Sequence, residues 1–220
     1  MYRHLDEQGQ PLPYPTGKVV CVGRSYRDHV SELNNPLPEQ PLFFIKPATS
    51  LVSLAQPLVL PKGLGAVHHE VEVALLIGHP LCNAAAEDAL AAIVGVGLAL
   101  DLTLRDLQNT LKAQGHPWER AKAFDGSCPI SGFVKPESLG DLQALDFSLT
   151  VNGQLRQSGN TSLMMWSIAE LLAQMSQCFT LTAGDIVLTG TPKGVSELVA
   201  HDSLELVLSG QHRFHGQIAG

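Results

Sequence analysis

The stretch VHHEVEVALLIG, residues 67–78, has the alternating pattern of a β-strand, and its two acidic residues decide how the rest of the chain is interpreted. Successive side chains of a strand point to opposite faces, so Glu70 and Glu72 share one face while Val71 and Val73 lie on the other. Two carboxylates one repeat apart repel each other, and burial would raise that cost. A divalent cation would remove the repulsion; the alternative is an ordinary solvated face of an amphipathic strand.

Asp101 offers a third oxygen ligand, because it interrupts the apolar stretch GVGLALDLT at residues 95–103. It lies where a predicted strand passes into a predicted helix, so a helix-capping role is the alternative. Hard cations prefer oxygen ligands, and Mg²⁺ is usually held by few carboxylates together with water and substrate oxygens. Glu70, Glu72 and Asp101 together therefore favour a Mg²⁺ or Mn²⁺ site.

Composition limits the classes of function. The chain has 220 residues, is 45% hydrophobic and carries a formal net charge of −7. That length suits one large domain, with two small domains as the alternative. The acidic balance and the lack of any basic run argue against a nucleic-acid partner. The 4 cysteines are isolated and lack zinc-ligand spacing, so we expect buried thiols rather than a disulfide scaffold.

The beginning of the chain is polar and rich in proline, with no apolar segment typical of a secretion signal. The longest apolar stretch, AAIVGVGLAL, is shorter than the ~20 residues that a membrane-spanning helix needs. We expect a short N-terminal arm at residues 1–17, followed by a single catalytic domain at 18–220. We also expect a cytoplasmic protein that does not act on a membrane.

Strand patterns outnumber helix patterns. Besides residues 67–78, strands are expected at 18–23, 42–47, 56–61, 95–103, 129–134, 146–159, 185–190 and 203–210, and helices at 84–93, 104–115 and 168–177. Asn152-Gly153 predicts a hairpin, Ser167 and Glu170 predict a capping box, and Thr103 is the expected N-cap of the second helix. Because strands and helices do not alternate regularly, the pattern predicts a mostly β fold with a few helices (α+β) and disfavours a doubly wound sheet.

Further polar residues stand at useful spacings. His29 and Glu32 are three apart on a predicted helical turn, and a carboxylate beside an imidazole orients it and raises its basicity, as a general base requires. Lys122 is flanked by alanines, which indicates partial burial, and a buried lysine could stabilise an enolate or exchange a proton. Gln108 and Arg105 share a helix face after Asp101. The alternatives are a surface ion pair, a surface lysine and a solvated helix face.

The loop LTGTPKGV at residues 188–195 follows a predicted strand and is punctuated by glycine and proline. Backbone N–H groups in such a loop can bind a carboxylate, and the alternative is a plain turn. The loop is not a P-loop, because the required order of glycine, lysine and hydroxyl residues is absent.

Seven motifs in chain order resemble the fumarylacetoacetate hydrolase family: CVGRSYRDHVSEL, FFIKP, HHEVEVALLIG, ALDLTLRDLQ, PWERAKAFDGSCPISGF, VNGQLRQSGNTSLM and GDIVLTGTPKGV. The match runs in order from about residue 17 to the C-terminus, and it is closest to the small single-domain branch of acylpyruvases and oxaloacetate-acting proteins. The resemblance implies a mixed β-sandwich roll of the type of that family's C-terminal domain, usually as a homodimer. It also implies Mg²⁺ or Mn²⁺ as cofactor and a small keto acid as substrate.

The resemblance also implies roles for single residues. The metal ligands would be Glu70, Glu72 and Asp101; the catalytic residues His29 and Glu32, on a mobile lid segment, and Lys122, near the metal; and the substrate-binding residues Arg24, Lys46, Gln108 and Thr191. The chain departs from the family pattern at Ser25, in GRSY for GRNY, and at Ser196, in GTPKGVS for GTPxGVG.

One intermediate would serve several reactions of this site. The hypothesis is that the metal stabilises the enolate of a short β-keto acid or 2,4-dioxo acid. We expect C–C bond cleavage, as acylpyruvate hydrolysis or oxaloacetate decarboxylation; the alternative is protonation without cleavage, the keto–enol tautomerisation of oxaloacetate. An alternative of another class is a non-catalytic binding protein for small acids on the same scaffold.

Overall fold

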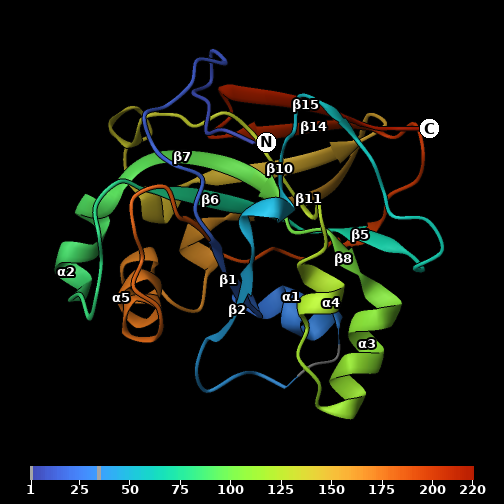
Figure 1. Ribbon diagram of the computed structural model, residues 1–220, viewed down its shortest axis with the longest axis horizontal. Helices are drawn as coiled ribbons and strands as arrows, with labels where there is room; N and C mark the ends of the chain where they lie inside the picture. The colour runs from blue at the N-terminus through green and yellow to red at the C-terminus, as the bar shows by residue number, and fades with distance from the viewer. Residues whose placement is uncertain (1, 34–35) are drawn as a thin grey trace.

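The computed structural model describes residues 2–33 and 36–220 and is built mainly from strands (Figure 1). Within these residues the central sheet has seven strands, in the order β2 (Leu42–Lys46), β1 (Val19–Gly23), β12 (Ile186–Leu188), β6 (Val71–Ile77), β7 (Ile93–Leu100), β9 (Cys128–Ile130) and β3 (Leu51–Ser53). A second sheet contains β11 (Gln154–Asn160), β10 (Asp146–Val151), β14 (Ser203–Leu208), β15 (His212–Ile218) and β4 (Pro57–Leu58). A small third sheet contains β13 (Ser196–Glu197), β5 (Val67–His69) and β8 (Thr103–Leu104).

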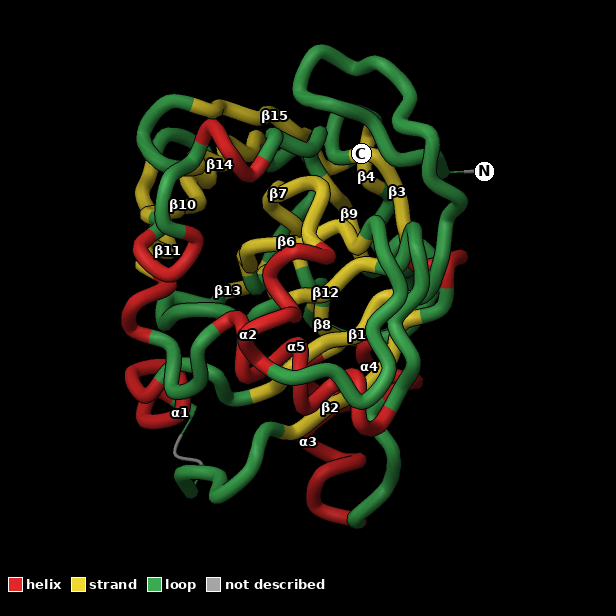
Figure 2. The backbone as a smooth tube through the Cα atoms, turned by 90° about the vertical axis from the view of Figure 1, so that its left-hand side faces the viewer, coloured by secondary structure: helices red, strands yellow, loops and turns green. Residues whose placement is uncertain are grey.

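The helices are short and lie around the central sheet. They are α1 (Arg27–Glu32), α2 (Ala86–Ala89), α3 (Arg105–Gln114), α4 (Glu119–Lys122) and α5 (Ile168–Cys178). Figure 2 shows β10, β14 and β15 at the top of the molecule and α1, α2, α3 and α5 in its lower half. None of the helices in residues 2–33 and 36–220 has the length and apolarity to cross a bilayer. The predicted class, mostly β with a few helices, is confirmed.

One apolar core lies between the central sheet and the second sheet, and a smaller apolar cluster lies on the opposite face of the central sheet. Every residue of β6, which pairs with β7 and β12, is buried, because each of its faces packs in one of these clusters. Leu75 on β6 belongs to one apolar cluster with Leu149 on β10 and Leu206 on β14, and all three side chains are fully buried. Removing this apolar area from water is the main term that stabilises the arrangement.

The stretch at residues 67–78 is not one continuous strand, contrary to the expectation. It divides at Glu70, so β5 pairs in the small sheet and β6 in the central sheet. At the break, the carbonyl oxygen of Glu70 accepts a hydrogen bond from Asp101 N–H (2.8 Å). The N–H of Val71 donates instead to a side chain, Gln157 Oε1, at 2.9 Å. The chain thus leaves one sheet and enters the other at the residue expected to bind the metal.

The hairpin and the capping box predicted from short sequence patterns are confirmed, but two other local predictions are wrong. Asn152 and Gly153 have φ of 51° and 76°, the left-handed conformations that a tight hairpin turn requires. Ser167 and Glu170 form the predicted capping box at the start of α5. The predicted N-cap role of Thr103 is wrong: Thr103 belongs to β8, and its hydroxyl donates to the carbonyl of Asp101 (3.0 Å). The helix expected at 84–93 is also wrong in length, because α2 covers only Ala86–Ala89 and a 3₁₀ turn follows it.

The N-terminal segment packs against the body of the protein. The fully buried His4 lies with Nε2 at 2.9 Å from the carbonyl oxygen of Gly184 and 3.0 Å from that of Pro15. Phe133 N–H donates to the carbonyl of Leu5 (2.8 Å), which attaches the segment to the strand region beyond β9. The first residues of the described chain therefore contribute to the fold.

Candidate metal centre

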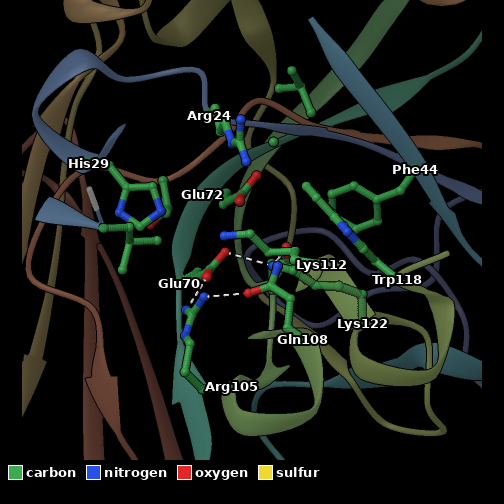
Figure 3. Close-up of a pocket in the computed structure, with 15 residues that line it drawn as sticks. Arg24, His29, Phe44, Glu70, Glu72, Arg105, Gln108, Lys112, Trp118 and Lys122 are labelled. Atoms are coloured by element: carbon green, nitrogen blue, oxygen red, sulfur yellow. Dashed lines mark hydrogen bonds and ion pairs between the residues drawn. The ribbon is translucent and has the colours of Figure 1, made fainter. Parts of the chain in front are cut away.

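Glu70, Glu72 and Asp101 form a buried acidic centre (Figure 3 shows its two glutamates). Their exposed fractions are 5%, 2% and 1%, and one carboxylate oxygen from each lies within 4.8 Å of the others. Antiparallel pairing of β6 with β7 matches Val71 with Leu100, which brings Glu70 and Asp101 side by side at the ends of the two strands. The strand register therefore assembles the three carboxylates that the sequence separates by 31 residues, from 70 to 101.

Lys122 and Arg105 counter the charge of the acidic centre. Lys122 comes from α4, and its ammonium lies 2.8 Å from Glu70 Oε2 and 2.5 Å from Asp101 Oδ2. Arg105, the first residue of α3, forms an ion pair with the other carboxylate oxygen of Glu70. Both cations are nearly inaccessible to solvent, so these pairs are only weakly screened.

Lys46 lies behind the acidic centre, away from the pocket. Its side chain is fully buried and is absent from the residues that line the pocket. The ammonium lies 2.8 Å from Asp101 Oδ1 and donates to Ser127 Oγ (3.0 Å) and to the carbonyl of Ser127 (3.1 Å). It also donates to the carbonyl of Lys122. The substrate-binding role expected for Lys46 has no support in this geometry, since Asp101 and the chain around Ser127 surround the ammonium.

The two glutamates of the acidic centre have different electrostatic environments. For Glu70, burial alone would raise the pKa, but Lys122 and Arg105 outweigh it and hold the pKa well below its ordinary value. For Glu72, burial together with the neighbouring Asp101 and Glu70 raises the pKa well above its ordinary value. For Lys122, burial alone would lower the pKa, but Asp101 and Glu70 outweigh burial and raise the pKa above its ordinary value. The ammonium therefore stays charged. Lys122 and Arg105 thus stabilise the ionised form of Glu70, whereas ionised Glu72 lacks enough neighbouring positive charge to offset its burial.

The donor set fits a hard divalent cation. All three side chains offer carboxylate oxygens, converge within 4.8 Å and are buried, and the raised pKa of Glu72 indicates a local deficit of positive charge. Glu72 Oε2 also accepts a hydrogen bond from Gly190 N–H (2.6 Å), which orients the carboxylate from the loop after β12. The residues present therefore match what Mg²⁺ or Mn²⁺ requires.

The pocket above the acidic centre has a polar side and an apolar side. On the polar side, Gln108 lines the pocket, and its Oε1 accepts from Arg105 (2.6 Å). Phe44 and Trp118 form the apolar side, with ring centroids 6.1 Å apart. Such a pocket can hold a small acid whose oxygens face the acidic centre and whose carbon chain contacts the rings.

His29 and Glu32 form a hydrogen-bonded pair on α1. His29 Nδ1 lies 3.1 Å from Glu32 Oε2, and Glu32 Oε1 accepts from Gly194 N–H (2.9 Å). Because a carboxylate can only accept, the hydrogen of a neutral His29 is on Nδ1, which leaves a lone pair on Nε2. His29 is 6% exposed and lines the pocket, so this nitrogen can serve as a base there.

Arg24 and Thr191 also line the pocket. Arg24 has a φ of 61°, a left-handed conformation that is uncommon for a residue with a side chain. Figure 3 shows its guanidinium pointing toward Glu72. The Thr191 hydroxyl donates to the carbonyl of Val71 (2.8 Å). Every expected site residue except Lys46 therefore reaches the pocket or, as with Glu32, a side chain that lines it.

Lys112 is a pocket residue that the sequence analysis did not single out, and Arg105 was noticed only as a neighbour of Gln108. Arg105, Gln108 and Lys112 stand at positions i, i+3 and i+7 of α3, so one helix face carries all three. Burial, followed by Arg24 and Arg105, lowers the pKa of Lys112. The helical spacing was the available signal for this set.

This fold and site define the class: the chain belongs to the fumarylacetoacetate hydrolase family, whose C-terminal domain model matches residues 18–218. It is 53% identical over 211 residues to oxaloacetate tautomerase YcgM of Escherichia coli (strain K12), covering 96% of each chain. It is 40% identical to a mitochondrial oxaloacetate decarboxylase of Dictyostelium discoideum, with 81% of this chain and 82% of that one covered.

A solved structure of a relative contains the ligands that the site chemistry suggests. Fumarylpyruvate hydrolase from Pseudomonas aeruginosa, in complex with Mn²⁺ and pyruvate, superposes with a TM-score of 0.91 at 34% identity, over 98% of this chain and 94% of that one. The resemblance noted in the sequence motifs is confirmed.

Proposed function

We propose that this chain is a Mg²⁺- or Mn²⁺-dependent enzyme that interconverts the keto and enol forms of oxaloacetate. The observation that carries the proposal is the acidic centre, whose three carboxylate oxygens converge within 4.8 Å beside Lys122 and under a base on α1. The 53% identity to an oxaloacetate tautomerase over nearly the whole chain supports the choice of substrate. The Mn²⁺ and pyruvate bound by the Pseudomonas relative support the choice of cofactor and of a 2-oxo acid.

Glu70, Glu72 and Asp101 would hold the cation. When bound, the cation would act as a Lewis acid toward the 2-oxo group and so make the adjacent C3–H bond more acidic. Lys122 has three N–H donors, and two of them already contact Glu70 and Asp101. The third would donate to the substrate oxygen on which negative charge develops, as an oxyanion donor does.

His29 would move the proton. In enol formation the C3–H bond would break, Nε2 of His29 would take the proton, the C–H electron pair would form the C2=C3 double bond, and the imidazolium would return the same proton to the 2-oxo oxygen. Glu32 would hold the Nδ1–H tautomer and stabilise the imidazolium that forms, because its carboxylate lies 3.1 Å from Nδ1. The reverse sequence returns the keto form, so the reaction needs no water and breaks no C–C bond.

Oxaloacetate carries a second carboxylate, and the pocket offers cations for it. Arg24 and Lys112 line the pocket together, and their mutual repulsion contributes to the lowered pKa of Lys112. A distal carboxylate between the two would relieve this repulsion. We therefore include Arg24 and Lys112 with Gln108 and Thr191 as substrate-binding residues, and assign Lys46 as a counter-ion that positions Asp101.

C–C bond cleavage is the second candidate, as acylpyruvate hydrolysis or oxaloacetate decarboxylation. The observation that favours it is the same His29–Glu32 pair, which could deprotonate a water for attack on a distal carbonyl. Relatives named as a decarboxylase and as a fumarylpyruvate hydrolase share the fold and most of the chain length.

One assay tests the proposal. The purified chain, treated with EDTA and reloaded with Mg²⁺ or Mn²⁺, is mixed with freshly dissolved oxaloacetate, and the ultraviolet absorbance of the enol is followed while pyruvate is measured in parallel. Metal-dependent loss of the enol signal without pyruvate is the expected result. Metal-dependent pyruvate formation would support cleavage instead. No effect on oxaloacetate or acylpyruvates would favour the binding protein and overturn both enzymatic proposals.

An apolar groove lined in part by Leu51, Val52, Leu58 and the exposed Val59 lies away from the pocket, and we propose that a second copy covers it in a homodimer. Light scattering after size-exclusion chromatography would test this: a monomeric mass would refute it. We also propose that the chain consists of an arm at 1–17 and a catalytic domain at 18–220. We further propose a cytoplasmic location and Mg²⁺ as the resident ion.

A further inference from the structure

Gln157 is a buried polar residue on a strand that is otherwise largely exposed, and the activity proposed above does not account for it. In β11, residues 154–156 are exposed, whereas Gln157 is 1% exposed. The pairing of β10 with β11 shifts register between Leu149 and Thr150, which leaves Arg156 as an extra residue. Such a β-bulge interrupts the alternation on one side of it. Residues 157–160 keep the regular pairing with β10, in which Gln157 faces the same side as its buried partner Leu149 and points into the core.

The amide of Gln157 touches both residues that flank Glu70. Its Oε1 accepts from Val71 N–H at 2.9 Å and lies 2.9 Å from His69 Nδ1. Glu70 therefore stands between two residues held by one oxygen atom. This is also the point at which the chain passes from β5 into β6, where no ladder bond supports the Val71 N–H.

The nitrogen of the same amide holds the loop that follows β12. Gln157 Nε2 donates to Thr191 Oγ1 and to the carbonyl of Pro192, both at 2.8 Å. Thr191 in turn donates to the carbonyl of Val71 (2.8 Å). Val71, Gln157 and Thr191 thus form a closed ring of hydrogen bonds between the strand that carries Glu70 and the loop that carries Thr191.

Two backbone groups fix the orientation of this amide. Val71 N–H can only donate and the Pro192 carbonyl can only accept, so the oxygen and nitrogen of Gln157 cannot be exchanged. It follows that His69 carries its hydrogen on Nδ1, and that Nε2 of His69 accepts from the Ser196 hydroxyl at 2.8 Å. Ser196, a departure from the family pattern, therefore completes the network from β13.

We propose that Gln157 is a positioning residue that sets the separation between the metal-binding strand and the substrate-binding loop. The inference rests on the proposed function, since it assigns Glu70 to the metal and Thr191 to the substrate. The amide oxygen serves Glu70, and the amide nitrogen serves Thr191. Because the Thr191 hydroxyl donates to Val71 and accepts from Gln157, these two hydrogen bonds fix the position of Thr191 and of the loop that carries it beside the pocket.

Substitution can remove the donor side of the Gln157 amide alone, or the donor and acceptor sides together. Gln157→Glu keeps the acceptor toward Val71 and His69 but sets a carboxylate oxygen against two acceptors, Thr191 Oγ1 and the Pro192 carbonyl. Gln157→Met preserves the volume and removes both sides. Gln154, exposed at the start of the same strand, supplies the controls Gln154→Glu and Gln154→Met.

Calorimetric titration with Mn²⁺, and then with pyruvate on the Mn²⁺-loaded protein, measures the Kd of each ligand without turnover. For Gln157→Glu we expect the Kd of pyruvate to rise about tenfold or more while the Kd of Mn²⁺ changes less than about threefold, and the KM of oxaloacetate to rise with little change in kcat. For Gln157→Met we expect both dissociation constants to rise about tenfold or more, within the range of lost outer-shell support. The Gln154 variants should match the unaltered chain.

The inference is overturned if both Gln157 variants bind Mn²⁺ and pyruvate as the Gln154 controls do, even with a lowered melting temperature, because Gln157 would then be a structural residue only. If the buried carboxylate of Gln157→Glu prevents folding, Gln157→Met decides, since it places no charge in the core. Failure of the unaltered chain to bind Mn²⁺ would instead overturn the proposed function, and this inference with it.

Discussion

The acidic centre and the His29–Glu32 pair face the same pocket but are supported in different ways. Glu70, Glu72 and Asp101 come from the junctions of core strands and are at most 5% exposed. The pair stands on α1, a six-residue helix, and the Glu32 side chain is 31% exposed. Charged groups that must stay fixed are thus held by strand register and buried ion pairs, whereas the group assigned to proton transfer is held by a few contacts near solvent.

Two side chains of α1 contact the loop that follows β12. Glu32 accepts one backbone hydrogen bond, from Gly194, and Asp28 forms an ion pair with Lys193 at 3.0 Å. Gly194 has a φ of 102°, and a Cβ there would lie 2.0 Å from the carbonyl oxygen of Arg156. Only glycine fits at position 194, because any Cβ there would clash with Arg156. The contact with Glu32 is made by the backbone N–H of this glycine. The comparison therefore predicts that changes in the two regions have effects of different size and kind.

The largest expected effect is that of Glu70→Gln. It preserves shape but removes one of three converging charges, so we expect Mn²⁺ affinity to fall more than about 100-fold, beyond the range typical of outer-shell partners, and tautomerisation and cleavage to be lost together. Calorimetry with Mn²⁺ and the oxaloacetate assay measure this. Glu87→Gln, on the exposed face of α2, is the matched control. Full activity of Glu70→Gln would refute the metal site.

His29→Ala is expected to come next and to separate the two regions. Losing a general base typically costs about 10²–10⁴ in rate, while the acidic centre stays intact, so turnover should fall in that range with unchanged Mn²⁺ affinity. Rates with oxaloacetate and with an acylpyruvate, measured beside the exposed control His79→Ala, give the answer. Hydrolysis or tautomerisation at the unaltered rate would remove His29 from the corresponding mechanism.

A smaller effect is expected in the pH dependence of stability of the metal-free protein. The pKa of Glu72 is raised above its ordinary value of 4.5, so its protonated form favours the folded state. This contribution is complete below pH 4.5 and is lost as the pH rises through the folded-state pKa, at no more than about 1.4 kcal/mol per pH unit. Glu70, whose pKa is lowered, loses its contribution only as the pH falls below 4.5.

Urea unfolding between about pH 5 and 8 measures this difference. Relative to Glu72→Gln, the unaltered metal-free chain should lose stability as the pH rises, and saturating Mn²⁺ should abolish the loss. Parallel pH profiles of stability for the two proteins would show that the pKa of Glu72 is not raised in the folded state.

The smallest effect is expected at the edge of α1. Lys193 and Asp28 are 66% and 71% exposed, and such surface pairs contribute about 0.2–1 kcal/mol. Lys193→Ala should therefore change kcat/KM by less than about fivefold and leave the melting temperature close to that of Lys135→Ala, an exposed control. A loss comparable with that of His29→Ala would show that this ion pair, and not the Gly194 N–H, positions α1.

The sequence indicated which residues gather at the site but not how the strands that carry them are arranged. Alternation identified Glu70 and Glu72 as neighbours, and the apolar context singled out Asp101. It did not reveal that the strand breaks at Glu70, because periodicity reports which face a side chain occupies and not which strand its backbone pairs with. Nor did the sequence reveal the partner of Thr103. Its hydroxyl donates to the backbone carbonyl of Asp101 instead of capping α3.

By itself the sequence determined the ingredients: paired carboxylates with a third acidic residue, a histidine–glutamate pair three residues apart, the hairpin at Asn152-Gly153 and the capping box of α5. These depend on interactions within a few residues, or on patterns that burial imposes. Only the tertiary structure decided that Lys46 lies behind Asp101, that Lys122 joins two carboxylates, and that the Gln157 amide links Val71 to Thr191. These placements depend on strand register and on contacts between residues far apart in the chain, where a shift of one residue reverses the face.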